Sequence, residues 1–417
     1  MSESVIFHVD VNSAFLSWEA CHRLSMDKNA VDIRSLTAVI GGDESKRHGI
    51  VLAKSTSAKK YGIQTGEPLA NARRKCPTLQ VFSPHFDCFV QYSEALMALL
   101  REYAPEVEPF SIDEAFCDFT GTKTLYGDLI SFAETLKDRI YNELGFTVNI
   151  GISTNRLLAK MASDFEKPNR VHTLFPSEIE AKMWPLPVSE LLYVGKGTQN
   201  KLYNLGIRTI GDLARYDVSV LTTHLGKHGS MIWNFANGND VSAISGKSSP
   251  AKGFGNSITL AEDCNDLESA HMILLSLCET VASRIRYAKA QVDVVSVTIT
   301  DADFHKSSHQ KTLDNATDIT EELYTHACAL FDEKWNHTPI RLLGVSTEKA
   351  PDDAFTQYSL FDTAQNEKLK KLNSAIDTIR DRYGENAVKR ARFLDSEQSH
   401  MTGGMSKAKR NSSKSNK

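Results

Sequence analysis

The spacing of apolar residues along the chain predicts two units built from the same succession of elements. Apolar residues alternate with polar ones where we expect strands, and recur every three or four positions where we expect helices. The first unit has expected strands at 5–10, 107–110, 114–119 and 147–152, and helices after residue 15 and at about 84–103 and 126–144. The second has expected strands near 254–260, 292–300, 309–313 and 340–347, and helices near 267–289 and 318–335. Each succession is a split β-α-β-β-α-β arrangement, so the pattern predicts an α+β protein.

Other segments fall outside these two units. Residues 30–80 form a small insert, and residues 238–253 are rich in Gly, Ser and Pro, which is typical of a linker between domains. Beyond Pro351 the chain is mostly polar. The spacing of five apolar residues predicts an amphipathic helix at about 364–383: Leu369, Leu372, Ile376, Ile379 and Tyr383. The basic residues at the end are expected to be disordered.

Composition narrows the class of protein only slightly. The 417 residues are 41% hydrophobic, enough for packed cores, and no apolar run is long enough to span a membrane. The first residues lack the layout of a signal peptide. Seven scattered cysteines, with no CxxC pair, favour a reducing cytoplasm over a disulfide framework or a zinc site. The net charge of −4 argues mildly against a nucleic-acid binder, so any basic surface must be local.

Three acids stand at the ends of expected strands. Asp113 and Glu114 lie at the tip of a hairpin, and Asp10 ends the first strand. In the split arrangement the third strand lies antiparallel beside the first, so the three carboxylates should converge. Oxygen ligands of this kind suit Mg²⁺, and a pair of ions would clamp the oxygens of a phosphoryl transfer. The alternative is that these acids are ordinary turn residues facing water.

Basic and glycine-rich segments suggest contacts to phosphates. The segment 54–62 combines hydroxyls and lysines at a turn into a helix, and Lys167 follows the end of another helix. A solvated helix N-cap and a lysine that complements a helix dipole are the alternatives. Gly195, Lys196 and Gly197 fit the turn of a helix-hairpin-helix, whose backbone N–H groups can approach a phosphate.

Several motifs, in order, resemble those of one family. They are HVDVNSAF, SIDEAF, NIGISTNRLLAKMASDFEKPNR, VGKG and QYSLF. Together they resemble the Y-family of translesion DNA polymerases, in particular the bacterial polymerase IV and UmuC group, from about residue 5 to 362. The resemblance implies a right-hand polymerase with a ferredoxin-like palm (1–15 and 83–174), small fingers (16–82), a helical thumb with a helix-hairpin-helix (175–240), a linker (241–253), a ferredoxin-like little finger (254–349) and a tail (350–417).

The resemblance also implies roles for individual residues. By motif position the metal ligands are Asp10, Asp113 and Glu114, which are also the catalytic residues, together with the backbone carbonyl of Val11. Phe15 corresponds to the steric gate that excludes a 2′-hydroxyl. The other implied contacts are Thr56, Lys59 and Lys167 with the dNTP, Gly195, Lys196 and Gly197 with DNA, and Gln357, Ser359, Leu360 and Phe361 with the sliding clamp. Thr56 and Lys59 stand where polymerase IV-like enzymes usually have Tyr and Arg.

The function expected from these features is error-prone, DNA-directed DNA synthesis across damaged templates. A monomeric cytoplasmic enzyme would use two Mg²⁺ ions, primer-template DNA and dNTPs, and would dock onto the beta sliding clamp. Two other classes remain open at this point: a palm-type nucleotidyl cyclase, and a catalytically silent scaffold that binds DNA or the clamp.

Overall fold

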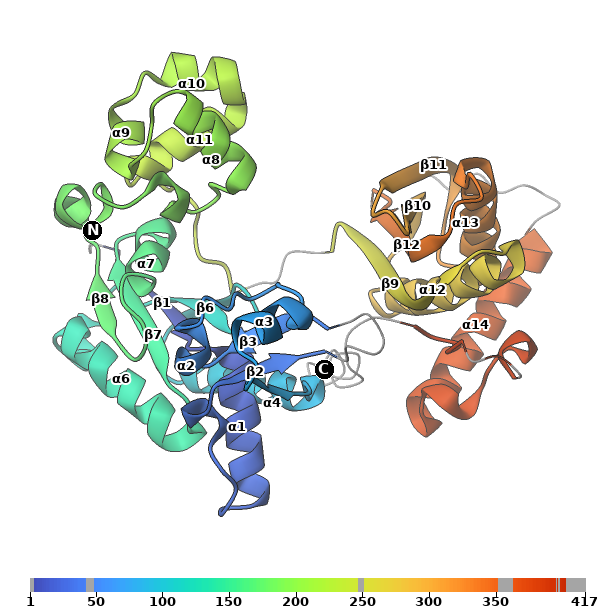
Figure 1. Cartoon of the computed structure of the whole chain (residues 1–417), viewed down its shortest axis with the longest axis horizontal. Coiled ribbons are helices and arrows are strands. Elements are labelled where there is room, and N and C mark those ends of the chain that lie inside the picture. The colour runs from blue at the N-terminus through green and yellow to red at the C-terminus, as the bar shows by residue number, and fades with distance from the viewer. Residues whose placement is uncertain are drawn as a thin grey trace. The chain divides into compact units, whose positions relative to one another are not determined.

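The computed structural model describes residues 4–42, 49–246, 251–351, 363–394, 396 and 398–402. The chain divides into two compact units, Met1–Gly42 with Ile50–Ser248, and Asp43–Gly49 with Ser249–Lys417 (Figure 1). Within the described ranges, none of the helices has the length and apolar character needed to cross a bilayer.

A five-stranded sheet forms the centre of unit 1. Its strands lie in the order β5-β6-β1-β7-β8. Their bounds are β1 (Ile6–Val11), β5 (Glu106–Pro109), β6 (Glu114–Asp118), β7 (Val148–Ser153) and β8 (Val171–Thr173). Strand β1 is antiparallel to both β6 and β7. The third predicted strand therefore lies beside the first, as the split β-α-β-β-α-β arrangement predicts.

The two faces of this sheet pack against different helices. One face shares a core with α1 (Ala14–Met26), α4 (Phe86–Arg101) and α6 (Leu129–Leu144), to which β1 contributes Phe7, Val9 and Val11. The alternate residues of β1, including His8, face α7 (Arg156–Ser163). Gly151 of β7 permits the close approach of α7, because a Cβ there would lie 2.0 Å from the carbonyl oxygen of Ala159. A short helix, α5 (Lys123–Tyr126), precedes α6.

The insert predicted at 30–80 has its own small sheet and core. The strands are ordered β3-β2-β4. The elements are η1 (Ile33–Ser35), β2 (Ala38–Gly41), β3 (Val51–Lys54), α2 (Thr56–Lys59), α3 (Leu69–Lys75) and β4 (Gln80–Phe82). Val39, Val51 and Leu69 are among the buried residues of its core. The insert is thus a packed lobe rather than a loop.

A helical region follows β8. It consists of η3 (Pro176–Glu178), η4 (Ile179–Met183), η5 (Val188–Glu190), α8 (Lys196–Asn204), α9 (Ile210–Arg215), α10 (Val218–Leu225) and α11 (Lys227–Ala236). Its core includes Leu157 and Leu158, so α7 packs between this region and the sheet. The first residues of the predicted linker are bonded to unit 1, since the Ser245 N–H donates to Glu108 Oε2 at 2.7 Å.

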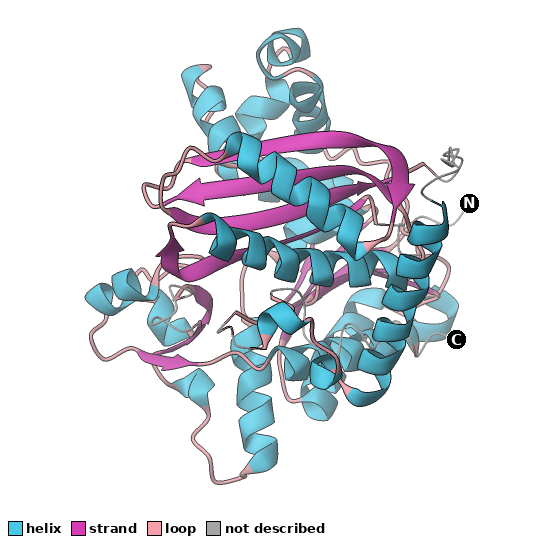
Figure 2. Cartoon of the chain, turned by 90° about the vertical axis from the view of Figure 1, so that its right-hand side faces the viewer, coloured by secondary structure: helices cyan, strands magenta, loops and turns pink. Residues whose placement is uncertain are grey.

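Unit 2 is a four-stranded sheet with two helices across one face (Figure 2). The elements are β9 (Gly253–Cys264), α12 (Leu267–Tyr287), β10 (Val292–Asp301), β11 (Lys306–Thr317), α13 (Thr320–Lys334) and β12 (Ile340–Lys349). The succession is the predicted one, but the strand order is β11-β10-β12-β9. In unit 2 the first strand, β9, pairs with the fourth, β12. In unit 1 the first strand, β1, pairs with both the third, β6, and the fourth, β7.

The predicted tail helix exists as α14 (Thr363–Tyr383), but its apolar stripe is not its most buried side. Leu372, Ile379 and Tyr383 are exposed, whereas Asn373 and Arg380 are buried. The reason is that the helices of unit 2 offer α14 polar partners rather than an apolar groove.

The chain also forms defined structure after α14. Between α14 and the chain end, η6 (Glu385–Ala387) and η7 (Ala391–Phe393) are formed, and Thr402 is buried against Ser276 of α12 at 2.8 Å. Residues 403–417, which include the basic end expected to be disordered, lie outside the described residues. Gln357, Ser359, Leu360 and Phe361 of the predicted clamp-binding peptide also lie outside them.

Candidate active site

The register of the central sheet brings acids of two strands together. Asp10, near the end of β1, is the direct cross-strand partner of Glu114, the first residue of β6. Val11 donates its backbone N–H to the carbonyl oxygen of Asp113 at 3.0 Å. Side chains directly opposite each other in an antiparallel pair lie on the same face, with Cβ atoms about 5 Å apart. Asp10 and Glu114 therefore share the sheet face on which α7 packs.

Lysines from α7 and the loop after it neutralise these acids. Lys160 forms an ion pair with Glu114 Oε2. The Nζ of Lys167 lies 3.0 Å from Asp10 Oδ1 and 2.8 Å from Asp164 Oδ1. The two ammonium groups therefore offset the negative charge of the half-buried carboxylates.

The two carboxylates differ in acidity. Burial raises the pKa of Asp10 to about 6, although Lys167 lowers it in part. Burial alone would raise the pKa of Glu114 as well. The hydrogen bonds and charges of His8 and Lys160 outweigh burial, so the pKa of Glu114 is lowered to about 2. Glu114 is therefore ionised at any physiological pH, whereas Asp10 depends more on a nearby cation.

His8 and Lys160 are residues of this site that the sequence prediction missed. His8 is fully buried, with Nε2 2.9 Å from Glu114 Oε2 and Nδ1 2.8 Å from Ser163 Oγ. Burial lowers the pKa of His8, so its imidazole is neutral at pH 7. The two-residue spacing of His8 and Asp10 on a strand could have indicated a shared face. Nothing local in the sequence links Lys160 to Glu114, which lies 46 residues earlier.

The donor set fits hard divalent cations. Carboxylates of Asp10, Asp113 and Glu114, with the Val11 carbonyl nearby, supply only oxygen, which Mg²⁺ prefers. In the part of the chain that the structure describes, one trio of acidic or histidine residues has all its ligand atoms within 4.8 Å of one another, and it lies at the end of β10 and in the turn after it: Asp301, Asp303 and His305. At least one distance among the three palm acids is therefore longer. A pair of ions about 3.5–4 Å apart needs ligands spread over a wider span than one ion does.

Phe15 is held in an aromatic cluster formed by α1 and α4. It lies in the first turn of α1, five residues after Asp10, and is half-buried. Its ring stacks on Phe89 with centroids 4.9 Å apart and an interplanar angle of 16°, and approaches Phe86 edge-on at 6.3 Å. Such packing fixes the plane of the ring.

Thr56 and Lys59 lie in α2 of the small lobe, and both are exposed. Ser55 caps this helix, because its side chain accepts from the Ala58 N–H at 3.1 Å. Within the described ranges, no hydrogen bond or ion pair joins Thr56 or Lys59 to the three acids. The capped, exposed turn leaves both side chains available to a ligand.

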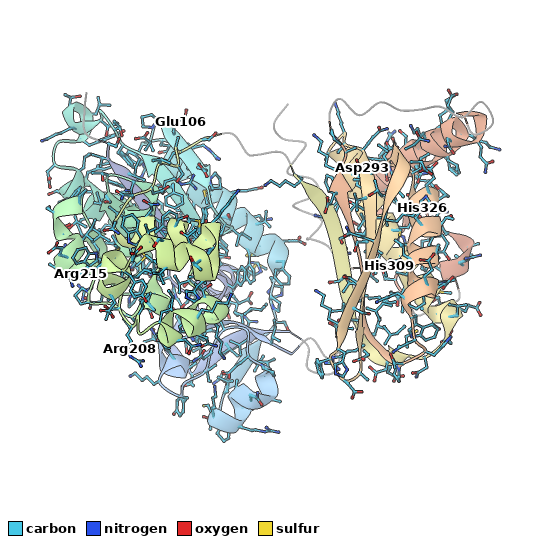
Figure 3. The ribbon with its side chains drawn as sticks, turned by 90° about the horizontal axis from the view of Figure 1, so that it is seen from above. Glu106, Arg208, Arg215, Asp293, His309 and His326 are labelled. Carbon is cyan, nitrogen blue, oxygen red and sulfur yellow. The ribbon has the colours of Figure 1, made fainter. Side chains whose placement is uncertain are left out.

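Of the predicted helix-hairpin-helix glycines, Gly195 precedes α8 and Gly197 lies in its first turn. Gly195 is the N-cap of this helix, and a Cβ placed on Gly195 or Gly197 would meet nothing within 4 Å. The backbone N–H groups at this end are therefore open to approach. Arg208 and Arg215, labelled in Figure 3, belong to the same region and lie over the rings of Tyr203 and Trp184 at 5.5 and 4.6 Å.

Models of known families match most of the chain. The impB/mucB/samB family model matches residues 9–164, and the model of that family's C-terminal domain matches residues 251–360. A model described as the thumb domain of DNA polymerase-iota matches residues 190–240.

Whole-length relatives carry the name DNA polymerase IV. The protein of that name from Clostridium acetobutylicum is 49% identical over 395 residues, which cover 94% of this chain and 99% of the relative. DNA polymerase IV 2 from Bacillus subtilis is 34% identical, with 94% and 95% covered. The chain belongs to the Y-family of DNA polymerases.

Solved structures agree with this polymerase in fold. A Y-family DNA polymerase chimera has a TM-score of 0.72 at 21% identity and covers 82% of this chain and 98% of its own. DinB from Sulfolobus solfataricus has a TM-score of 0.54 at 22% identity, with 83% and 98% covered. The predicted α+β right-hand polymerase fold is therefore confirmed. It also follows from the family that the chain is a DNA-directed DNA polymerase rather than a cyclase or a silent scaffold.

Proposed function

We propose that this Y-family polymerase carries out translesion synthesis by two-metal nucleotidyl transfer, adding dNTPs to the 3′-hydroxyl of a primer. In this proposal Asp10, Asp113, Glu114 and the Val11 carbonyl hold two Mg²⁺ ions. The observation that carries the proposal is the direct pairing of Asp10 with Glu114, while the backbone of Asp113 is tied to Val11. When bound, the ions would make the primer hydroxyl a better nucleophile and stabilise the oxygens of the leaving pyrophosphate.

The surrounding residues prepare these acids for their task. Lys160 and His8 both contact Oε2 of Glu114, which favours the ionised carboxylate and leaves Oε1 for a cation. Lys167 neutralises Asp10, and we propose that it turns to the triphosphate when that substrate binds. Charge on the departing phosphates would then be met by an ammonium that already stands beside the site.

Contacts to the rest of the nucleotide follow from the small lobe and the aromatic cluster. Lys59 and Thr56 would contact the triphosphate from α2, and a lysine there provides a point charge rather than the bidentate fork of an arginine. Phe15, held by its stack on Phe89, would lie under the sugar and exclude a 2′-hydroxyl.

The partners of the reaction would be bound further along the chain. The open backbone at Gly195, Lys196 and Gly197 would contact a phosphate of the primer-template duplex without reading its sequence. We also propose a monomer in the cytoplasm that docks on the beta sliding clamp through Gln357 to Phe361. The seven cysteines, all free, are consistent with a reducing compartment.

Primer extension by an Asp113→Ala variant tests the assignment of the acids. We expect the rate of primer extension to fall by at least about 1000-fold, because the variant loses a metal ligand that supplies negative charge and fixes the coordination geometry. Asp118→Asn, at the far end of β6, is the matched control and should extend primers at nearly the native rate. Equal extension by native chain and Asp113→Ala would remove Asp113 from the site.

A further inference from the structure

A fully buried amide lies directly beside the acids. Asn149 is in β7, where it is the cross-strand partner of Asp10. Its neighbours Val148 and Ile150 belong to the apolar core, whereas Asn149 faces the side on which α7 packs. A buried amide without hydrogen-bond partners destabilises the fold, so the partners of Asn149 must be accounted for.

Every hydrogen-bonding position of this amide is used. Its Oδ1 accepts from Asn12 Nδ2 at 3.1 Å and from the Arg170 N–H at 3.2 Å. Its Nδ2 donates to the carbonyl oxygens of Ser163 at 3.0 Å and Glu166 at 2.7 Å. An asparagine offers two acceptor sites and two donors, so nothing is left over. The four partners are the residue after β1, the last residue of α7 and two residues of the loop that follows α7.

Asn12 adds a second hold on the same loop. Its Oδ1 accepts from the Asn169 N–H at 2.9 Å while its Nδ2 bonds Asn149. Glu166 is therefore held on one side of Lys167, and Asn169 and Arg170 are held on the other. The backbone that carries Lys167 is fixed within one residue on its N-terminal side and two on its C-terminal side.

We infer that Asn149, assisted by Asn12, is a positioning residue that holds the 166–170 loop so that the ammonium of Lys167 stands at the phosphate end of the active site. The inference rests on the proposed contact of Lys167 with the triphosphate. A lysine has a flexible four-carbon stem, so a fixed backbone is what limits where its ammonium can reach. Ordering this loop before the nucleotide arrives lowers the entropy lost on binding.

Steady-state insertion of a single dNTP on an undamaged template tests the inference. Asn149→Ala should raise KM for the dNTP about tenfold and change kcat less than about threefold, since it loosens a binding group and leaves the metal ligands in place. Asn373→Ala is the matched control: Asn373 is a buried asparagine with three hydrogen bonds in α14 of unit 2. It should lower stability without changing KM.

A double-mutant cycle separates positioning from general stability. Lys167→Ala alone should raise KM roughly 10- to 100-fold, and adding Asn149→Ala to it should raise KM no further. A second readout without catalysis is hydrogen exchange of the Asn169 and Arg170 amides, which should lose protection in Asn149→Ala and keep it in Asn373→Ala.

The outcomes distinguish this inference from the proposed function. Two results would overturn the positioning role of Asn149 but not the proposed function. One is a roughly tenfold rise in KM when Asn149→Ala is added to Lys167→Ala, and the other is an unchanged KM in folded Asn149→Ala. An unchanged KM in Lys167→Ala would remove Lys167 as a triphosphate ligand, and this inference with it. If Asn149→Ala does not fold, Asn12→Ala can replace it, because it removes only the hydrogen bond to Asn169 and one bond to Asn149. The KM of Asn12→Ala, with and without Lys167→Ala, then decides between the same outcomes.

Discussion

The buried carboxylate of Glu279 offers a quantitative test of how the tail is attached to unit 2. Glu279 lies in α12 and is 3% exposed. Its Oε2 is 2.7 Å from Arg380 Nη1 of α14, and its Oε1 pairs with Arg390. Arg390 also pairs with Glu321 of α13 at 2.7 Å. One carboxylate therefore bridges two segments of the tail, and we expect Glu279→Gln to release them.

The size of the effect follows from the burial of the partner left behind. Arg380 is 7% exposed and, without Glu279, would have no acidic partner among the described residues, where its other hydrogen bonds go to the carbonyl oxygen of Val388 and to His400. Removing one member of a buried ion pair costs about 3–5 kcal/mol. A cost of about 3 kcal/mol corresponds to roughly 100-fold more frequent opening of the docked tail.

Hydrogen exchange over residues 363–394 measures that opening directly. Protection should fall roughly 100-fold in Glu279→Gln, while primer extension without the clamp should be unchanged, since no residue of the proposed active site is altered. The control is Glu333→Gln, because the Glu333 side chain is 67% exposed and pairs with His309 at 3.0 Å. An exposed pair is worth about 0–1 kcal/mol, so this variant should match the native protein. Unchanged protection in Glu279→Gln would refute the reasoning.

The same carboxylate gives the docking a defined pH dependence. Burial would raise the pKa of Glu279, but Arg390 and Arg380 outweigh it and hold the pKa below its usual value. A carboxylate whose pKa is lower in the folded chain stabilises it above the unfolded pKa of about 4.3, and the gain is lost as pH falls through the folded pKa. Tail protection should therefore be constant from pH 7 to 5 and decline at lower pH. In Glu279→Gln this dependence should largely disappear.

Three further predictions concern the proposed active site and its partners. Phe15→Ala should raise ribonucleotide insertion by roughly 100-fold or more relative to dNTP insertion, and an unchanged sugar preference would remove Phe15 as the gate. Gly197→Val should weaken binding to all duplex sequences about equally, because a side chain would cover N–H groups that face open space; a sequence-dependent loss in a fluorescence anisotropy assay would contradict a phosphate contact. Replacing Leu360 and Phe361 by Ala should abolish stimulation by the sliding clamp while sparing distributive synthesis, and retained stimulation would exclude the peptide as the docking site.

The sequence alone was sufficient for the elements and for the acids of the site. Strand and helix periods are local properties, so both β-α-β-β-α-β successions could be predicted from spacing. Asp10 and Glu114 could be placed together because the split arrangement puts the third strand of unit 1 beside the first, and the structure pairs these residues directly. The motifs around them were enough to predict the family.

Only the tertiary structure decided which polar groups meet at a distance. Lys160 meets Glu114 across 46 residues, and Lys167 meets Asp10 across 157, through packing that no local pattern encodes. The same holds for α14, where the sequence shows an apolar stripe but the buried residues are Asn373 and Arg380, which contact the carboxylates of α12 and α13. The physical reason is that periodicity reports how a segment could bury apolar surface, whereas buried charges and amides are decided by the partners that the rest of the fold brings to them.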